Sequence, residues 1–282
     1  MKKTIELLAP AGDLARLKTA VRYGADAVYL GGKRFSLRSR ASNFELEDIA
    51  EGVRFAREYG AHVHVTVNII PHEDDFDGLD DYLRQLEKIG VHAVIVASPT
   101  IVRRVKTVAP KLEVHLSTQM SSTNSQAVRF YQRLGADRVV LARECTMDQV
   151  QQICGHSEVP IETFIHGGMC VNYSGRCTLS NAMTLRDANR GGCAQSCRWR
   201  YHLYQGNQKL SDDNLLFSMG SKDLMAADYV RNMIHAGVAS LKIEGRMKSA
   251  YYIAVVVRAY RQLIDWLLEY PEEDAQTVIL EA

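Results

Sequence analysis

The sequence has no long hydrophobic run and no low-complexity tract. Its first residues pass from Lys2 and Lys3 into a short apolar stretch that Pro10 and Gly12 interrupt, which is too short for a signal peptide or a membrane span. Of the 282 residues, 46% are hydrophobic and 24% are charged, as in ordinary globular proteins. We therefore expect a folded cytoplasmic protein that has no membrane partner.

An excess of charge of either sign is also missing. The formal net charge is +1, so the molecule as a whole has no electrostatic field that would favour nucleic acid or a membrane surface. Three common motifs are absent: the Gly-x-x-x-x-Gly-Lys-Ser/Thr phosphate loop, the Gly-x-Gly-x-x-Gly dinucleotide motif and the His-Glu-x-x-His zinc protease motif. ATP, nicotinamide and metalloprotease chemistry therefore have no support in the sequence.

Six cysteines are present, and disulfides between them are not expected, because cytoplasmic thiols are kept reduced. Cys145 and Cys154 fall at a strand end and in a helical stretch, as small packing residues do. The other four, with 6, 15 and 3 residues between successive members, lie in a glycine-rich segment: Cys170, Cys177, Cys193 and Cys197. Together they form one candidate metal site.

Four thiolates can hold either a tetrahedral zinc ion or a [4Fe-4S] cluster. Zinc ribbons usually carry two Cys-x2-Cys pairs, and neither close pair here has that spacing. Glycines beside the cysteines let the backbone fold tightly around an inorganic centre and direct its amides at the sulfurs. The spacing favours an iron–sulfur cluster, with zinc and a closed metal site that only stabilises the fold as the alternatives.

Short β-branched runs alternate with helical patterns along the chain. Eight runs are typical of strands: 5–9, 27–30, 62–68, 93–97, 113–117, 138–141, 161–165 and 240–243. Eight stretches have the period of a helix: 14–23, 46–59, 79–89, 101–108, 125–134, 147–153, 222–236 and 250–269. Several end on a glycine suited to a helix C-cap, such as Gly90 and Gly135. This α/β repeat predicts a (β/α)8 TIM-like barrel, with an open sheet of fewer strands as the alternative.

The repeat is interrupted once, after the seventh predicted strand. The interruption forms a cysteine-rich insertion at about residues 166–220, within a barrel domain of residues 1–270. Loops that follow barrel strands project from the carboxyl face, where barrel enzymes keep their active sites. The acidic tail at 271–282 is expected to begin a linker to a further C-terminal domain. The four cysteines are thus expected over the barrel mouth.

Polar residues follow several of the other predicted strands. We expect substrate-binding side chains at the barrel mouth: Asn68, Gln119, Arg143, Glu144 and Arg246. Charged groups within an apolar strand are costly unless paired or functional, which makes Lys242 and Glu244 candidate catalytic residues. His166, directly after the seventh strand, is a third. The alternatives are a rim ion pair and a rim histidine with ordinary hydrogen bonds.

The cysteine segment has a basic neighbourhood despite the neutral chain. Between Cys170 and Tyr201, five arginines stand against one acidic residue, Asp187, which is a net charge of +4. The arginines are candidate nucleic-acid contacts: Arg176, Arg186, Arg190, Arg198 and Arg200. The alternative is a solvated loop that happens to be basic.

Residues 162–180 resemble the signature of the peptidase U32 family, whose historical name is collagenase-like. The matching pattern is Glu162-x-Phe164-x-x-Gly167-Gly168-Met169-Cys170-x4-Gly175-x-Cys177-x-Leu179-Ser180, in which Gly168 replaces the usual Ser or Ala. The resemblance covers nearly the whole chain, including residues 7–12, 114–119 and 240–246. The run 190–199 is most similar to the branch of tRNA hydroxylation proteins.

This resemblance implies an RNA-modifying enzyme. Its branch is implied to hold a four-cysteine iron–sulfur cluster and to support prephenate-dependent formation of 5-hydroxyuridine at the tRNA wobble position. Prephenate, a small dicarboxylate, is chemically suited to Arg143, Lys242 and Arg246. The resemblance also leaves open a homo-oligomer or a hetero-oligomer with a family paralogue. The alternatives are a U32-type peptidase, for which the sequence shows no activated nucleophile, and a cluster-holding RNA-binding or assembly module without catalysis.

Overall fold

The structure, a computed structural model, describes residues 5–37 and 44–271. The tail expected at 271–282 therefore lies, apart from Pro271, outside the described residues. Among the helices of the described ranges, none combines the length and apolar character needed to cross a membrane.

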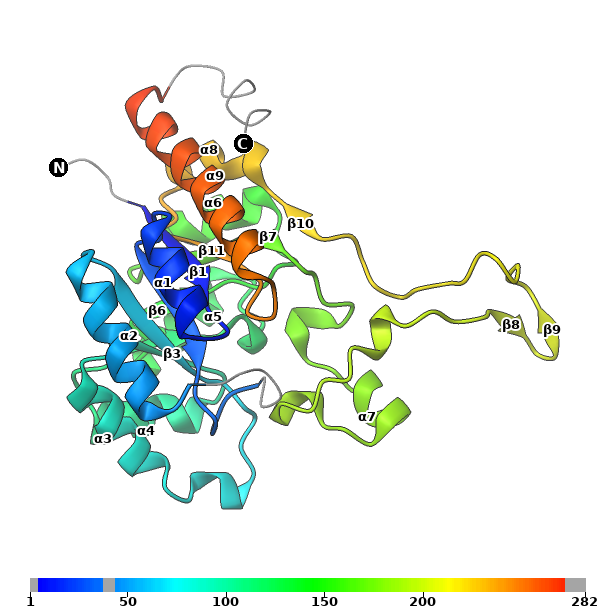
Figure 1. Cartoon of the computed structure of the whole chain (residues 1–282), viewed down its shortest axis with the longest axis horizontal. Helices are drawn as coiled ribbons and strands as arrows, with labels where there is room; N and C mark the ends of the chain where they lie inside the picture. Colours follow the sequence, from blue (N-terminus) through cyan, green and yellow to red (C-terminus); the bar gives the residue numbers. More distant parts are fainter. Residues whose placement is uncertain (1–4, 38–43, 272–282) are drawn as a thin grey trace.

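Eight parallel strands close into a barrel, which confirms the predicted fold (Figure 1). The barrel strands are β1 (Glu6–Pro10), β2 (Ala27–Gly31), β3 (His62–Val67), β4 (Ala93–Val96), β5 (Glu113–Leu116), β6 (Arg138–Val140), β7 (Ile161–Gly167) and β11 (Ser240–Ile243). Each pairs with the next in this order, β6 pairs with β7, and β11 lies between β7 and β1. All eight strands therefore end at the same face of the barrel.

Helices surround the barrel, as Figure 1 shows. They are α1 (Leu14–Arg22), α2 (Leu46–Glu58), α3 (Leu79–Ile89), α4 (Pro99–Val108), α5 (Ser125–Leu134), α6 (Met147–Gly155), α8 (Val230–Ala236) and α9 (Ala250–Glu269). Gly90 and Gly135 end α3 and α5 in the left-handed conformation, with φ of 87° and 115°. The apolar faces of the helices pack on the outward side chains of the strands to form one main core.

The helix predicted over 222–236 is wrong in its first half. Residues Leu224–Met225 instead form β10, which pairs antiparallel with the end of β7, and the Ala226 amide donates to the Ile165 carbonyl at 2.9 Å. A short 3-10 turn follows, and α8 begins only at Val230. Apolar residues in this segment extend the edge of β7, and a short apolar run cannot show which structure it will adopt.

The insertion between β7 and β10 contains short helical segments and one hairpin. The helical segments are η3 (Tyr173–Gly175), α7 (Leu179–Thr184), η4 (Ala188–Arg190) and η5 (Ser196–Arg198), and the hairpin pairs β8 (Tyr204–Gln205) with β9 (Gln208–Lys209). Two contacts attach the insertion to the loop after β3: the Ile70 amide donates to the Asn189 carbonyl at 3.0 Å, and Arg190 forms a two-pronged ion pair with Asp75. The insertion is thus held against the barrel.

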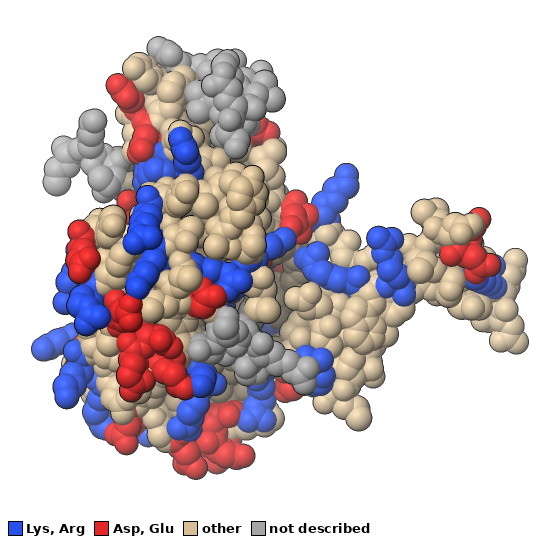
Figure 2. All heavy atoms as spheres, in the orientation of Figure 1, with Lys and Arg blue, Asp and Glu red and all other residues tan. Residues whose placement is uncertain are grey.

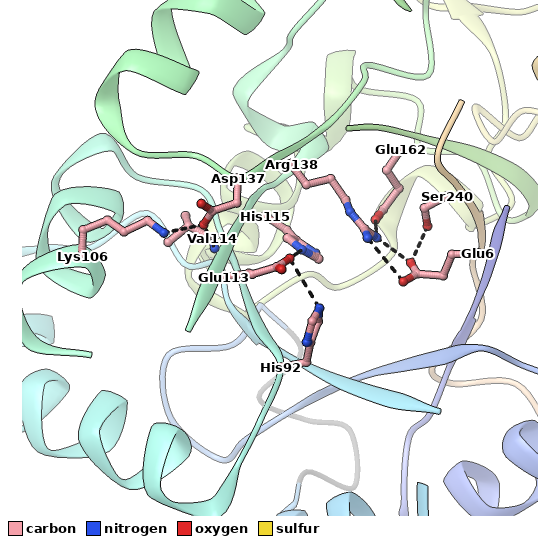
Figure 3. A network of polar contacts seen from close by, with 10 residues as sticks. All are labelled: Glu6, His92, Lys106, Glu113, Val114, His115, Asp137, Arg138, Glu162 and Ser240. Carbon is pink, nitrogen blue, oxygen red and sulfur yellow. Dashed lines mark hydrogen bonds and ion pairs between the residues drawn. The ribbon is translucent and has the colours of Figure 1, made fainter. Parts of the chain in front are cut away.

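Charged side chains fill the amino-terminal end of the barrel (Figure 3). Arg138, the first residue of β6, donates to Glu162 at 3.2 Å and to Glu6 at 3.3 Å, and Ser240 donates to Glu6 at 2.7 Å. Glu162 is fully buried, and its second oxygen accepts from Lys242 at 2.8 Å. Burial alone would raise the pKa of Glu162, but Lys242 and Arg138 lower it below its usual value. The buried charges thus compensate one another.

A second group of polar side chains joins histidines of β3 and β5 and His92, which directly precedes β4. Glu113 lies within 3.0 Å of His115 and 3.4 Å of His92 (Figure 3), while the His64 and His115 rings meet edge to face with centroids 4.7 Å apart. His64 and His115 are completely buried, and burial is the main cause that lowers both pKa values. Both imidazoles are therefore neutral in the folded protein near pH 7.

We expect the free energy of unfolding to fall as the pH falls below about 6.5. In the unfolded chain His64 and His115 then bind protons, whereas burial lowers their pKa values in the folded protein and keeps them neutral there. Each such histidine contributes up to about 1.4 kcal/mol per pH unit. Urea unfolding between pH 5 and 8 measures the slope, which His64→Leu should reduce and His235→Gln, at an exposed position on α8, should not. An equal slope in wild type and His64→Leu would contradict this account.

Candidate functional site

A cavity of about 520 Å³ opens at the carboxyl face of the barrel, under the insertion. The ends of the barrel strands form the floor of the cavity, and residues of the insertion form one of its walls. Predicted site residues that line it are Asn68, Gln119, Arg143, Glu144, Cys170, Cys177, Cys193, Cys197, Arg198, Lys242, Glu244 and Arg246. Strand ends and insertion, far apart in sequence, therefore contribute to one space.

All four cysteines of the insertion face this cavity. Cys177 is buried, and its backbone is fixed at both ends: Asn189 donates to the Cys177 carbonyl at 2.9 Å and accepts from its amide at 3.2 Å. Burial raises the pKa of the Cys197 thiol, and the other three cysteines add to the rise while Arg198 opposes it. Cys197 thus lies near enough to the other three sulfurs for their charges to act on its thiol.

Within the described ranges, no group of three or more His, Cys, Asp or Glu side chains is arranged to hold a single metal ion. The four thiols share one cavity without meeting at one point. The chemistry of four soft sulfur donors with a glycine-rich backbone fits an iron–sulfur group.

Cys145 and Cys154 lie outside the insertion, and their thiols are part of the core packing. Cys145 and Cys154 pack, half-buried, against the main core, and burial raises the pKa of each thiol to about 11. Both are therefore protonated near neutral pH, and thiolates rather than thiols bind metals.

Three cations converge on the cavity from the barrel. The Lys242 ammonium lies 4.5 Å from the centre of the Tyr29 ring, and the Arg143 guanidinium lies 3.8 Å from the centre of the Phe164 ring. Arg246 is buried and donates to Ser36 at 3.1 Å and to Thr66 at 3.0 Å. This floor is cationic and aromatic, which suits a planar or anionic ligand.

Glycine is required where Arg246 crosses the floor. A Cβ on Gly31, at the end of β2, would lie only 2.4 Å from the Arg246 guanidinium and the Ser36 hydroxyl. A Cβ on Gly12 would lie 2.2 Å from the Arg246 carbonyl oxygen. The two glycines let the backbones approach closely enough to bury this arginine beneath the cavity.

Gln119 presents a fixed amide group to the cavity. Its Oε1 accepts from Asn68 Nδ2 at 2.9 Å and from Ser117 Oγ at 3.2 Å, which defines the orientation of the amide. The Nε2 atom is buried and has no hydrogen-bond partner among the described residues. A buried donor without a partner is costly, so this one is available for an acceptor on a bound ligand.

The two glutamates of the predicted site have structural contacts. Glu144 accepts hydrogen bonds from the Ser174 amide at 2.7 Å and the Ser174 hydroxyl at 3.2 Å, which anchors the start of the insertion. The Glu244 amide donates to the His166 carbonyl at 2.8 Å, and the Glu244 carbonyl accepts from Tyr252 at 3.1 Å. The Glu244 side chain lines the cavity, so it stays a candidate for proton transfer.

His166 does not line the cavity. Its Nδ1 lies 3.2 Å from the Tyr260 hydroxyl, and its ring packs against Tyr252 and Tyr260 of α9. Burial lowers its pKa. The register between β7 and β11 shifts between Lys242 and Ile243, so that Ile243 stands opposite His166. The position does not support the predicted catalytic role for His166.

The five arginines of the insertion divide between exposed and attached positions. Arg176 and Arg198 are exposed and also donate to backbone carbonyls, those of Gln119 at 2.7 Å and Met169 at 2.9 Å. Arg200 is exposed. Arg190 is held by Asp75, and Arg186 donates to the Cys193 carbonyl at 3.3 Å. Only Arg198 of the five lines the cavity.

A model of peptidase family U32 matches residues 12–281, which is nearly all of the chain. The chain belongs to the peptidase U32 family. The tRNA hydroxylation protein P1 of Bacillus subtilis is 52% identical over 96% of this chain and 65% of its own length. A 23S rRNA 5-hydroxycytidine synthase of Escherichia coli is 41% identical over 94% of this chain and 40% of its own length. A collagenase of Porphyromonas gingivalis is 36% identical over 92% of this chain.

Solved structures show the same fold as this U32 chain. The structure of a U32 peptidase aligns with a TM-score of 0.58 at 15% identity, over 87% of this chain and 95% of the other. Tryptophan synthase of Mycobacterium tuberculosis aligns with a TM-score of 0.52 at 10% identity, over 91% of this chain and 92% of the other. At these identities the likeness concerns the barrel alone.

Reasoning from the sequence missed the residues that support the site from below. Glu162 pairs with Lys242, and Tyr29 and Phe164 flank the cations of the floor. Glu162 did carry a signal, because it is a charged residue inside an otherwise apolar predicted strand, like Lys242 itself.

Proposed function

We propose that this protein hydroxylates a pyrimidine base in RNA and that an iron–sulfur cluster is part of its site. The support is the placement of four cysteines on the wall of a cationic barrel cavity, in a chain 52% identical over 96% of its length to a tRNA hydroxylation protein. A second relative is named for hydroxylation of cytidine in ribosomal RNA. The finer assignment is formation of 5-hydroxyuridine at the wobble position of tRNA.

In this proposal Cys170, Cys177, Cys193 and Cys197 hold a [4Fe-4S] cluster, with zinc as the less favoured alternative. When bound, the cluster supplies electron transfer or Lewis acidity next to the substrate. The protein would position the ligands: Asn189 fixes the Cys177 backbone, and Arg186 donates to the Cys193 carbonyl.

The floor of the cavity is proposed to bind the small dicarboxylate co-substrate, prephenate. Arg143 and Lys242 lie against aromatic rings and are oriented toward the cavity, where carboxylates would form charge-assisted hydrogen bonds. Glu162 accepts a hydrogen bond from the Lys242 ammonium at 2.8 Å, which opposes the lowering of the Lys242 pKa by burial. Exposed arginines of the insertion are proposed to contact RNA phosphates.

Mass spectrometry of nucleosides tests the proposal. Cells without the gene should lack 5-hydroxyuridine and its derivatives in tRNA, and a plasmid copy should restore them. If tRNA is unchanged and 5-hydroxycytidine disappears from ribosomal RNA, the substrate assignment is wrong and the reaction class stands. Unchanged levels of both nucleosides would contradict the proposal.

A peptidase function is suggested by the family name and by one relative named as a collagenase. A serine or cysteine peptidase needs a nucleophile activated by a base, most often a histidine. No histidine is among the described residues that line the cavity. The geometry therefore favours the RNA-modifying function.

Gln119→Glu tests the predicted dicarboxylate site. The carboxylate keeps the acceptor for Asn68 and Ser117, but it replaces the unpartnered amide donor with a negative charge. We expect prephenate to bind about 10- to 100-fold more weakly, as measured by isothermal titration calorimetry. Gln151→Glu, at an exposed position on α6, adds the same charge away from the cavity and should bind as wild type. Unchanged affinity of Gln119→Glu would remove Gln119 from the site.

A further inference from the structure

A two-stranded ribbon projects from the insertion, away from the barrel (Figure 1). We define residues 199–217 as the arm. The backbones of Tyr201 and Phe217 exchange two hydrogen bonds of 2.8 Å, and the β8–β9 hairpin closes the far end. Because a short isolated hairpin buries little surface, its exposed side chains contribute little to folding and are free to serve another purpose.

The first strand of the arm carries aromatic and basic side chains. No acidic residue occurs between Arg198 and Ser211, while the returning strand carries Asp212 and Asp213, so the net positive charge is confined to the first strand. Trp199 is 44% exposed and Tyr204 is 59% exposed, and the Trp199 and Tyr201 rings lie with their centres 6.5 Å apart. Figure 2 shows basic side chains on the part of the arm nearer the body.

Arg200 is the exposed cation of this strand. Lys209 is paired with Asp213, and Arg198 lies 3.8 Å from Asp223. No ion pair of Arg200 occurs among the described residues. Arg200 stands between Trp199 and Tyr201 in sequence, and because successive side chains of an extended strand point to opposite faces, we expect the cation on the face opposite the two rings.

This combination suits single-stranded nucleic acid. Aromatic rings stack on unpaired bases whatever their sequence, and interleaved cations contact the phosphates. Trp, Tyr and Arg are also enriched at protein interfaces, so the choice of RNA rests on the continuity of the arm with the cavity. Paired RNA fits less well, because its bases already stack on one another.

The arm is continuous with the cavity. Cys197 and Arg198 both line the cavity, and Trp199 begins the arm directly after them. A strand of RNA lying along the arm would therefore lead to the cavity mouth. A target base leaving the strand there would face the opening of the cavity.

We propose that the arm binds an unpaired stretch of the RNA substrate beside the target base, by stacking on Trp199 and Tyr204 and by a phosphate contact of Arg200. This inference rests on the proposed function, because it takes RNA to be the substrate. It adds that the protein recognises unpaired rather than double-stranded RNA, and that it does so outside the cavity.

Fluorescence anisotropy with two labelled RNAs tests the proposal: a hairpin with uridine in its single-stranded loop, and a fully paired duplex of equal length. The wild-type chain should prefer the hairpin. Trp199→Ala and Tyr204→Ala should each weaken hairpin binding roughly 5- to 100-fold and leave duplex binding nearly unchanged. Tyr204→Phe keeps an aromatic ring and should bind the hairpin as wild type does. Arg200→Gln should lower the slope of log affinity against log salt by about 0.7.

Leu215→Ala is the matched control, because Leu215 is an exposed apolar residue on the returning strand of the arm. It should bind the hairpin as wild type. Hairpin binding that is equal in wild type, Trp199→Ala and Tyr204→Ala would overturn the proposal and leave the proposed function intact. If the wild-type chain sediments as a dimer and the same variants sediment as monomers, the arm is a protein interface instead. A wild-type chain that binds neither RNA would contradict both proposals.

Discussion

Replacing Cys177 with serine is expected to reduce 5-hydroxyuridine in tRNA to the level of cells without the gene, a loss of at least about 100-fold. Cys177 is the buried member of the four cysteines, and two hydrogen bonds with Asn189 fix its backbone at the cavity wall. Serine keeps the size of the side chain, but its hydroxyl is a poor ligand for iron compared with a thiolate. The purified variant should also lose iron and inorganic sulfide.

Cys154→Ser is the matched control for this experiment. Cys154 packs half-buried on the core, and its pKa of about 11 keeps it protonated. This variant should keep both its iron and its modified nucleoside. Full iron in Cys177→Ser would show that the cysteine is no ligand. Full nucleoside without iron would show that the cluster has no part in the reaction.

Glu162→Gln is expected to lower the free energy of unfolding by about 3–5 kcal/mol, because it removes a fully buried carboxylate from between two cations. Lys242 would then be buried without a counter-ion, whereas Arg138 would keep Glu6. Chemical denaturation at pH 7 measures the loss. Glu158→Gln, an exposed carboxylate that accepts from Gln132 on the surface, should change the free energy by less than about 0.5 kcal/mol.

The double variant Glu162→Gln, Lys242→Met separates lost charge balance from other damage at this position. It removes the unpaired ammonium, so it should recover about half or more of the lost stability. A double variant that is less stable than Glu162→Gln would show that the Lys242 ammonium still stabilises the fold without Glu162, through its contacts with the Tyr29 and Phe164 rings.

The barrel could be predicted from sequence because each βα unit carries its own local signals. The β-branched runs, the helical periods and the glycines that end α3 and α5 all act within about a dozen residues. The segment 224–226 could not be predicted, because its conformation depends on the free edge of β7, some 60 residues earlier in the chain. Local patterns cannot show such an edge.

The candidate site was predictable as a set of residues but not as a geometry. Cysteine spacing placed four thiols in one insertion, and strand ends indicated the polar residues of the mouth. The orientation of the Gln119 amide depends on Asn68 and Ser117 together, and the state of Lys242 depends on Glu162, 80 positions away. His166 was predicted to follow the seventh strand, but it lies within β7, and its ring packs against Tyr260 of α9.

The attachment of the insertion has a consequence for how such proteins can diversify. The charged network lies at the amino-terminal end of the barrel, far from the insertion. The insertion is joined to the barrel at its two chain ends, and it also contacts the barrel mouth and the loop after β3 through the Arg190–Asp75 and Asn189–Ile70 contacts. Exposed residues of the insertion that make none of these contacts can therefore change with little cost to folding. A lineage can acquire new specificity by altering this one segment while it inherits the barrel unchanged.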